Sequence, residues 1–285
     1  MAISKKVALV TGSNQGIGFA IVEALCHCFE GDVVLTSRDK EKGQEAVARL
    51  QAKGLKPVFH QLDITCQDSI RNCEEFLREK YRGLDILVNN AGIAYKRDSN
   101  APALEQARNT LKTNFWGTLN LCKALFPLLR NHARVVNVSS TCGCLRNIPN
   151  HAKREEFYTA RSTMTLDHLE SLMRRYESEV ETSAEDPQAW AALGWGNSHY
   201  GISKAGVTAA TAIMARDFPR QFPDKRDVLI NCCCPGYVST NMSSYKGPLS
   251  IEQGAITPVY LATLPPDDAS NPNGQYCKEK HVAEW

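Results

Sequence analysis

One stretch near the start of the chain decides the fold: Val7-Ala8-Leu9-Val10, followed at once by Thr11-Gly12-Ser13-Asn14-Gln15-Gly16-Ile17-Gly18. The first four residues are a short apolar run, typical of a strand buried on both faces, and helical spacing of apolar residues begins at Ile17. Glycines between a strand and a helix let the backbone approach a pyrophosphate, whose charge the helix N-terminus stabilises. The residues expected to bind a cofactor here are Gly12, Asn14, Gln15, Gly16, Ile17 and Gly18.

The same alternation of strand and helix continues along the chain. Further short apolar runs are Val33-Val34-Leu35, Val58 to Leu62, Ile86-Leu87-Val88, Val135 to Val138 and Val228-Leu229-Ile230. Segments with helical spacing separate them, and this pattern predicts an α/β, Rossmann-type, doubly wound parallel sheet with helices on both faces. Because no repeat or linker divides the sequence, we expect a single domain over residues 1–285.

A long segment, about 141–199, interrupts this alternation. It contains no strand-like run, but apolar residues follow helical spacing from Leu166 to Val180. We predict a helical insertion that lies on the domain before Tyr200. Its apolar stripe is expected to pack on the flanking helices, with a partner-binding helix as the alternative.

Composition favours a small-molecule partner. Lysine and arginine number 33 against 31 acidic residues, a net charge of +2, which gives no reason to expect nucleic acid or a membrane surface. No signal peptide or apolar run of about 20 residues is apparent. The 11 cysteines are odd in number and lie mostly in apolar stretches, so we expect reduced thiols and a cytoplasmic protein.

The cysteines do not predict a metal site. Cys232, Cys233 and Cys234 fall in one strand, where consecutive side chains point to opposite faces and cannot all reach one ion. Cys142 and Cys144 follow Ser140, so one of them lining the substrate pocket as a reactive thiol is a minor alternative to an inert role.

Tyr200 and Lys204 stand four residues apart in Tyr200-Gly201-Ile202-Ser203-Lys204. On a helix this spacing places both side chains on one face, where an ammonium favours the phenolate and makes the phenol a better acid. Together with the glycine-rich turn, the pair indicates redox chemistry on a carbonyl group.

The end of the second strand predicts which cofactor binds. An acidic residue there accepts a ribose hydroxyl, whereas a 2′-phosphate requires an arginine, and Arg38 stands at this place. We therefore expect NADPH/NADP rather than NADH. The neighbouring Asp39 argues the other way unless it caps the next helix. Asp63 and Ile64 are expected to contact the adenine, and a simple turn is the alternative.

Six motifs, in order and in context, resemble those of the short-chain dehydrogenase/reductases. They are Thr11 to Gly18, Asn89-Asn90-Ala91-Gly92, Asn114, Val138-Ser139-Ser140, Tyr200 to Lys204 and Pro235-Gly236. Within that family the chain is most similar to cytosolic NADPH-dependent carbonyl reductases, through Gly31 to Thr36, Phe59 to Ile64, Lys112 to Phe115, Thr257 to Leu261 and the long segment before the tyrosine.

This resemblance implies a catalytic group of four residues. Tyr200 is the general acid for a carbonyl that receives hydride, and Lys204 holds the nicotinamide ribose and lowers the pKa of the tyrosine. Ser140 fixes the substrate oxygen, while Asn114 keeps a helix open and anchors a water that links Lys204 to solvent. Further cofactor contacts are implied for Asn90, Tyr200, Lys204, Pro235, Gly236, Val238 and Thr240.

Substrate contacts are expected from two groups of residues. Trp195, His199 and Tyr237 flank the catalytic elements and, with Ser140, suit quinones, aromatic ketones, aldehydes or lipid-derived carbonyls such as prostaglandins. Tyr95, Lys96, Arg97 and Gln106 occupy positions at which the similar reductases bind glutathione. A solvated basic loop is the alternative for this second group.

Two other functions stay open: a non-catalytic NADPH-binding regulatory protein, and an NAD(P)-dependent alcohol or hydroxysteroid dehydrogenase. Members of the first kind usually lack the tyrosine or the lysine, and Tyr200 and Lys204 are both present. Because the similar reductases with a long insertion are monomers, we also expect a monomer.

Overall fold

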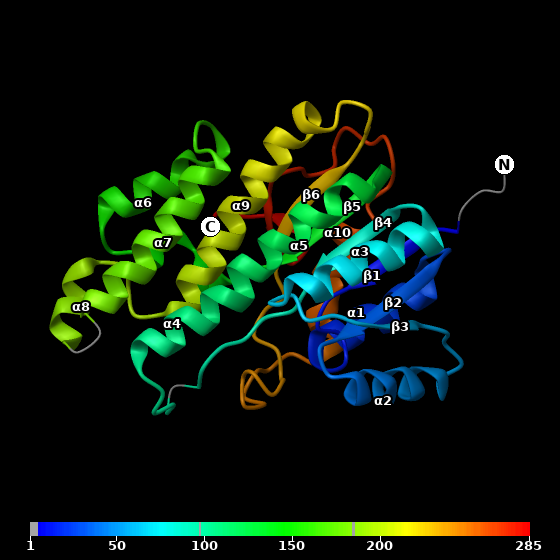
Figure 1. The fold of residues 1–285 in the computed structure, drawn as a ribbon, viewed down its shortest axis with the longest axis horizontal. Coiled ribbons are helices and arrows are strands. Elements are labelled where there is room, and N and C mark those ends of the chain that lie inside the picture. Colours follow the sequence, from blue (N-terminus) through cyan, green and yellow to red (C-terminus); the bar gives the residue numbers. More distant parts are fainter. Residues whose placement is uncertain (1–4, 97, 184–185) are drawn as a thin grey trace.

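The computed structural model of the protein describes residues 5–96, 98–183 and 186–285. It contains one eight-stranded sheet with the order β3-β2-β1-β4-β5-β6-β7-β8 (Figure 1). The strands are β1 (Val7–Val10), β2 (Asp32–Ser37), β3 (Val58–Gln61), β4 (Leu84–Asn89), β5 (Leu129–Val138), β6 (Leu229–Cys234), β7 (Tyr276–Lys278) and β8 (His281–Val282). All neighbouring pairs are parallel except β7 with β8, so the predicted sheet is confirmed.

Helices cover both faces of the sheet. They are α1 (Gly16–Cys28), α2 (Lys40–Gln51), α3 (Gln67–Tyr81), α4 (Ala103–Leu111), α5 (Thr118–Leu125), α6 (His151–Tyr158), α7 (Leu166–Ser183), α8 (Pro187–Leu193), α9 (His199–Gln221) and α10 (Ile251–Ala262). One apolar core lies between the sheet and α3, α4, α5 and α9, and a second lies between the sheet and α1, α2 and α10. The strand order reverses between β1 and β4, where a ligand crevice is expected in such a sheet.

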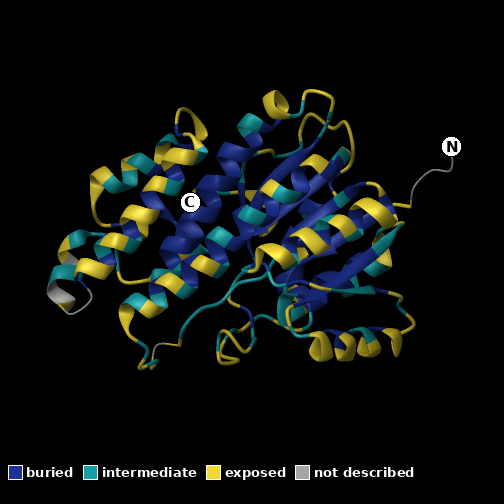
Figure 2. Ribbon diagram, viewed as in Figure 1, coloured by how far each residue is buried: buried dark blue, intermediate teal, exposed yellow. Residues whose placement is uncertain are grey.

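Helix α9 is buried along most of its length (Figure 2). Small residues allow this close packing: a Cβ atom at Gly201 would lie 2.7 Å from the carbonyl oxygen of Cys142, and one at Gly206 would lie 2.9 Å from Met173. The helix is therefore held in one position against the sheet, with Tyr200 and Lys204 in its first turns. No helix in the described part of the chain combines the length and apolarity needed to cross a membrane.

The predicted insertion contains α6, α7 and α8 together with short 3₁₀ turns, and it lies outside α9 and α4 (Figure 1). The apolar stripe of α7 faces the domain, since Leu169, Leu172 and Met173 are buried in the first core. Arg108 on α4 also forms an ion pair with Glu181 on α7 at 2.7 Å. This stripe packs on the flanking helices, as the first of the two sequence interpretations predicted.

The cysteines of β6 alternate between the two faces of the sheet. Cys232 and Cys234 belong to one core and Cys233 to the other, as the strand periodicity predicts. All 11 cysteines are free thiols.

Candidate active site

The glycine-rich turn is shaped by backbone contacts. Gly12 has φ +58°, and a Cβ atom there would lie 2.8 Å from Cα of Ala91, so only glycine fits. The hydroxyl of Thr11 accepts hydrogen bonds from the amides of Asn90 and Ala91 at 3.0 and 2.9 Å. The side-chain amide of Asn90 donates to the carbonyl oxygens of Thr11 and Gly12, each at 3.0 Å. Asn90, predicted as a cofactor contact, therefore also supports the turn.

A cavity of about 880 Å³ lies at the carboxyl ends of the strands, beside this turn. Most of the predicted cofactor residues line it: Gly12, Asn14, Gln15, Gly16, Ile17, Arg38, Asp63, Ile64, Asn90, Tyr200, Lys204, Pro235 and Thr240. Three others, Gly18, Gly236 and Val238, are outside its lining. Gly18 has a packing role, because a Cβ atom there would lie 2.5 Å from the side-chain nitrogen of Asn90. The cavity therefore has the lining, the glycine turn and the helix N-terminus that a dinucleotide phosphate requires.

One end of this cavity is basic. Arg38, Lys42 and Arg49 all line it, and the guanidinium of Arg49 lies 4.3 Å above the ring centre of Phe19. Asp39 is occupied as the cap of α2: it accepts from the amide of Lys42 at 3.1 Å and pairs with the Lys42 ammonium at 3.4 Å. Lys42 and Arg49 were not predicted from the sequence, although their spacing along one helix could have indicated that both face the cofactor cavity.

Asp63 has a local role as well as a place in the cavity lining. One of its carboxylate oxygens accepts from both the amide and the hydroxyl of Thr65, each at 2.8 Å. The strand ends at Gln61, before Asp63. Asp63 thus forms a turn beyond β3, which is the alternative that the sequence left open, and the same turn brings Ile64 to the cavity.

Of the four predicted catalytic residues, Tyr200 and Lys204 line this cavity, whereas Ser140 and Asn114 are outside its lining. Tyr200 and Lys204 lie on α9, with the ammonium 5.6 Å from the centre of the tyrosine ring. Ser140 follows β5; its hydroxyl accepts from the amide of Cys142 at 3.1 Å, and it is near enough to Tyr200 to favour the ionised phenol and lower its pKa. Lys204 donates from Nζ to the carbonyl oxygen of Val138 at 2.7 Å.

The pKa of Tyr200 differs in direction from the sequence expectation. Burial raises it well above the ordinary value of 10, with a smaller contribution from the nearby Cys142, and the hydrogen bond from Ser140 only partly opposes this. Lys204 is not among the groups that set this shift; burial lowers its own pKa to about 8, and its ammonium donates to the carbonyl oxygen of Val138. The phenol is therefore held in its protonated form at neutral pH.

Asn114 lies in a π-helical segment, Lys112–Gly117, between α4 and α5. Its side chain accepts from the amide of Ile93 at 2.8 Å and donates to the carbonyl of Ile93 and to the hydroxyl of Ser203, both at 2.9 Å. The Asn114 side chain thus links the segment after β4 to α9. The π-helical turn is wider than an α-helical turn, and it is the locally opened helix expected at this position.

A second cavity, of about 960 Å³, adjoins the first, and Tyr200 lines both. Of the predicted substrate residues, Tyr95, Lys96, Gln106, Trp195 and His199 line it. Ser140 is outside the lining of both cavities. Tyr237 is 57% exposed and lines neither cavity, because the turn after Gly236 directs its side chain to solvent. Arg97 lies outside the described residues.

Several of these side chains already have partners within the chain. The indole nitrogen of Trp195 donates to Glu179 at 2.7 Å, and the ring is almost fully buried, so Trp195 belongs to the core as well as to the cavity wall. Gln106 donates to the carbonyl of Ala101 at 2.8 Å. Cys142 and Cys144 also line this cavity; Cys142 is exposed, whereas Cys144 is buried and burial raises its pKa.

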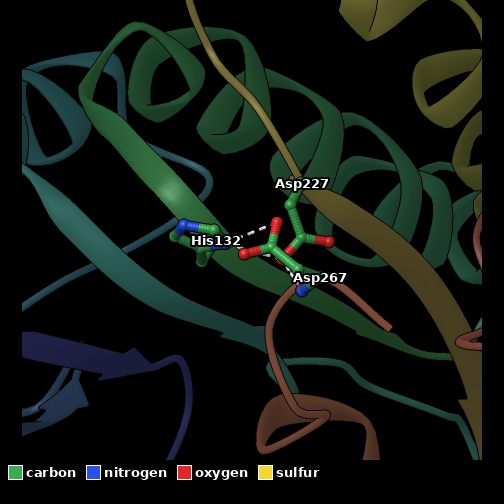
Figure 3. Close-up of side chains that lie close together, drawn as sticks. All are labelled: His132, Asp227 and Asp267. Carbon is green, nitrogen blue, oxygen red and sulfur yellow. Dashed lines mark hydrogen bonds and ion pairs between the residues drawn. The ribbon is translucent and has the colours of Figure 1, made fainter. Parts of the chain in front are cut away.

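A second polar cluster lies at the opposite ends of the strands, where His132, Asp227 and Asp267 approach one another (Figure 3). One carboxylate oxygen of Asp227 accepts from Nδ1 of His132 at 2.8 Å, from the guanidinium of Arg134 at 3.0 Å and from the amide of Asp267 at 3.0 Å. With a buried guanidinium already on that oxygen, this arrangement is a hydrogen-bonded ion pair that joins β5 to the segment before β6.

Comparison with known proteins agrees with this geometry. A family profile described as short chain dehydrogenase matches residues 6–152. Carbonyl reductase (NADPH) 3 of Rattus norvegicus is 47% identical, and carbonyl reductase (NADPH) 1 of Mus musculus is 48% identical, each over 285 residues that cover all of both chains. The structure of salutaridine reductase from Papaver somniferum matches with a TM-score of 0.82 and 30% identity, covering 95% of this chain and 99% of that one.

Proposed function

The chain belongs to the short-chain dehydrogenase family and is an NADPH-dependent carbonyl reductase, and we propose that Tyr200 is the general acid of its reaction. The observation that carries this proposal is the position of Tyr200, whose side chain lines both the cofactor cavity and the second cavity. A group at that boundary can protonate a substrate in one chamber while the reductant occupies the other. NADPH, when bound, supplies the hydride.

The cofactor cavity supports NADPH through residues of two kinds. Gly12 lets the turn pack against Ala91, and this turn presents the N-terminus of α1 to the cavity, where a phosphate group would bind. Arg38 has no ion-pair partner among the described residues, and with Lys42 it offers positive charge to a 2′-phosphate. Asp39, which would favour a free ribose hydroxyl, is engaged by Lys42.

We propose that reduction begins with Tyr200 protonated. Because burial raises the pKa of the phenol, the proton is in place at neutral pH and is transferred to the carbonyl oxygen as negative charge develops there. Ser140 can turn its one hydroxyl proton from Tyr200 to the same oxygen, while the amide of Cys142 holds the serine oxygen in place. In the reverse direction this protonated phenol would have to lose its proton first, which disfavours alcohol oxidation near pH 7.

Lys204 and Asn114 are proposed to return the proton to Tyr200. The pKa of Lys204, lowered by burial to about 8, lets its ammonium release and regain a proton near neutral pH. Both amide hydrogens of Asn114 are already used, by Ile93 and Ser203. We therefore propose that the relay water is held by a backbone carbonyl of the π-helical turn rather than by the Asn114 side chain.

The second cavity is proposed as the site for ketones, aldehydes and quinones. Aromatic side chains of Tyr95, Trp195 and His199 supply flat walls, which suit aromatic and quinone rings and the chains of prostaglandin-like carbonyls. Lys96 is exposed at its rim and is a candidate partner for the carboxylates of glutathione or its conjugates.

The substitution Tyr200→Phe tests the assignment. It removes only the hydroxyl, so NADPH binding should persist while turnover of menadione and of aryl ketones falls by about a thousandfold or more. NADPH oxidation at 340 nm and cofactor binding by fluorescence are measured in parallel. Undiminished turnover in the variant would contradict the assignment. Bound NADPH with no turnover in the parent chain would favour the regulatory alternative.

We further propose that the protein is a cytoplasmic monomer. Helix α7 covers α4 and α9, and the free state of all 11 cysteines suits a reducing compartment. Sedimentation equilibrium should give the mass of one chain, 31.6 kDa, and a mass of two or four chains would contradict the proposal.

A further inference from the structure

His199 is the first residue of α9 and immediately precedes Tyr200. Its Nδ1 atom lies 2.6 Å from the hydroxyl oxygen of Tyr176, which is on α7 and fully buried. A side chain of the insertion therefore holds the residue next to the general acid.

The hydrogen-bonding direction of this pair follows from its surroundings. Burial raises the pKa of Tyr176 far above neutrality and lowers that of His199 below its ordinary value, so the phenol is protonated and the imidazole is neutral at pH 7. The Tyr176 hydroxyl has no other hydrogen-bond partner in the described part of the chain, so it donates to Nδ1. The proton of the imidazole is then on Nε2.

The orientation of the imidazole is fixed as well. Its centre lies 5.3 Å from the ring of Trp190 and 6.3 Å from that of Tyr176, so two aromatic rings restrain it. His199 lines the second cavity together with Tyr200. Because Nδ1 points to Tyr176, the Nε2 edge points the other way, and within residues 5–96, 98–183 and 186–285 this nitrogen has no hydrogen-bond partner.

We propose that Nε2–H of His199 donates a hydrogen bond to a second acceptor on the substrate, close to the carbonyl that Tyr200 protonates. The site then selects carbonyl compounds with a neighbouring acceptor, such as vicinal diketones, over plain ketones. A ketone without that acceptor displaces the water bound to Nε2–H of His199 but forms no hydrogen bond in its place. Its kcat/KM is therefore lower. This inference rests on the proposed function of Tyr200.

The test compares phenylpropanedione with propiophenone, an aryl diketone and monoketone of one carbon skeleton. The two ketones differ in intrinsic reactivity. This difference cancels when the ratio of their kcat/KM values is compared between the parent chain and its variants. His199→Ala should lower the diketone preference about tenfold, the effect of one lost hydrogen bond. Tyr176→Phe keeps the ring and should lower the preference by a smaller factor, about threefold, because the imidazole is less well held. Tyr158→Phe, on the exposed face of α6, is the matched control and should leave it unchanged.

The outcomes separate this inference from the proposed function. If His199→Ala changes both substrates by the same factor, or neither, the inference is overturned while the role of Tyr200 stands. If the parent chain reduces neither these ketones nor menadione, the proposed function fails. The inference is then decided by diketone binding, measured through tryptophan fluorescence: weaker binding by His199→Ala supports it, and equal binding overturns it.

Discussion

Nζ of Lys204 lies 2.7 Å from the carbonyl oxygen of Val138, at the point where α9 crosses the end of β5. The ammonium is buried, and burial lowers its pKa to about 8 from the ordinary 10.5. The folded chain therefore holds the ammonium of Lys204 in a site that solvates its charge less well than water does. The proposed proton relay needs a cation at this site.

Replacing this lysine should therefore separate stability from activity. Lys204→Met removes the charge, so the free energy of unfolding at pH 7 should rise by about 1–3 kcal/mol while turnover is lost. Urea unfolding and NADPH oxidation provide the two measurements. The pKa is lowered on folding, so the stabilising effect should be largest below pH 8 and should disappear as the pH approaches 10.5. A variant less stable than the parent at pH 7 would refute this account.

The same lysine predicts a pH dependence of catalysis. The turnover number for carbonyl reduction should decline as the pH rises through about 8. Lys204 loses its proton in this range, while Tyr200 remains protonated. Lys204→Arg keeps the charge, so any residual activity in that variant should show no decline in this range. A decline at the same pH in both proteins would assign the titration to another group.

Cofactor preference should depend on Arg38. Arg38→Ala should raise KM for NADPH by roughly 10- to 100-fold and leave KM for NADH nearly unchanged, since only the 2′-phosphate loses a charge-assisted hydrogen bond. Arg71→Ala, an exposed position on α3 outside the cavity lining, is the control. An unchanged ratio of the two KM values in Arg38→Ala would show that the cofactor assignment to Arg38 is wrong.

The hydrogen bonds and ion pair of Asp227 should stabilise the fold at neutral pH and lose this effect in acid. Asp227→Asn leaves the buried guanidinium of Arg134 without its carboxylate, and the cost should be about 2–4 kcal/mol at pH 7. Burial alone would raise the pKa of Asp227, but its hydrogen bonds with Asp267, His132 and Arg134 outweigh this and lower it below 3.8. The parent chain therefore loses this contribution as the pH falls below about 4. Urea unfolding at pH 7 and pH 3 should show the difference between parent and variant shrinking at the lower pH.

The fold and most of the cofactor cavity could be predicted because their signals are local. The run Val7 to Gly18 contains a strand, a turn and the start of a helix in one continuous stretch, and β2 leads to Arg38 in the same way. Strands β7 and β8 were missed, since each is two or three residues long and neither has an apolar run.

The remaining features depend on contacts between distant segments. Asp227 and His132 are 95 positions apart, and Tyr176 and His199 are 23 apart, so no spacing rule brings either pair together. The pKa of Tyr200 could not be predicted from its spacing to Lys204, because burial of the phenol is the largest cause of its shift. Tyr237 was expected at the substrate, but the backbone turn at Gly236 sets its direction.

The insertion performs two tasks with the same helix. One face of α7 covers helices that would otherwise be open to other molecules, while Tyr176 on that helix reaches the residue beside the general acid. Substitutions on the buried face of α7 are therefore expected to change both its packing on the domain and the contact between Tyr176 and His199. Engineering of this face of the insertion should be assayed for both stability and substrate preference.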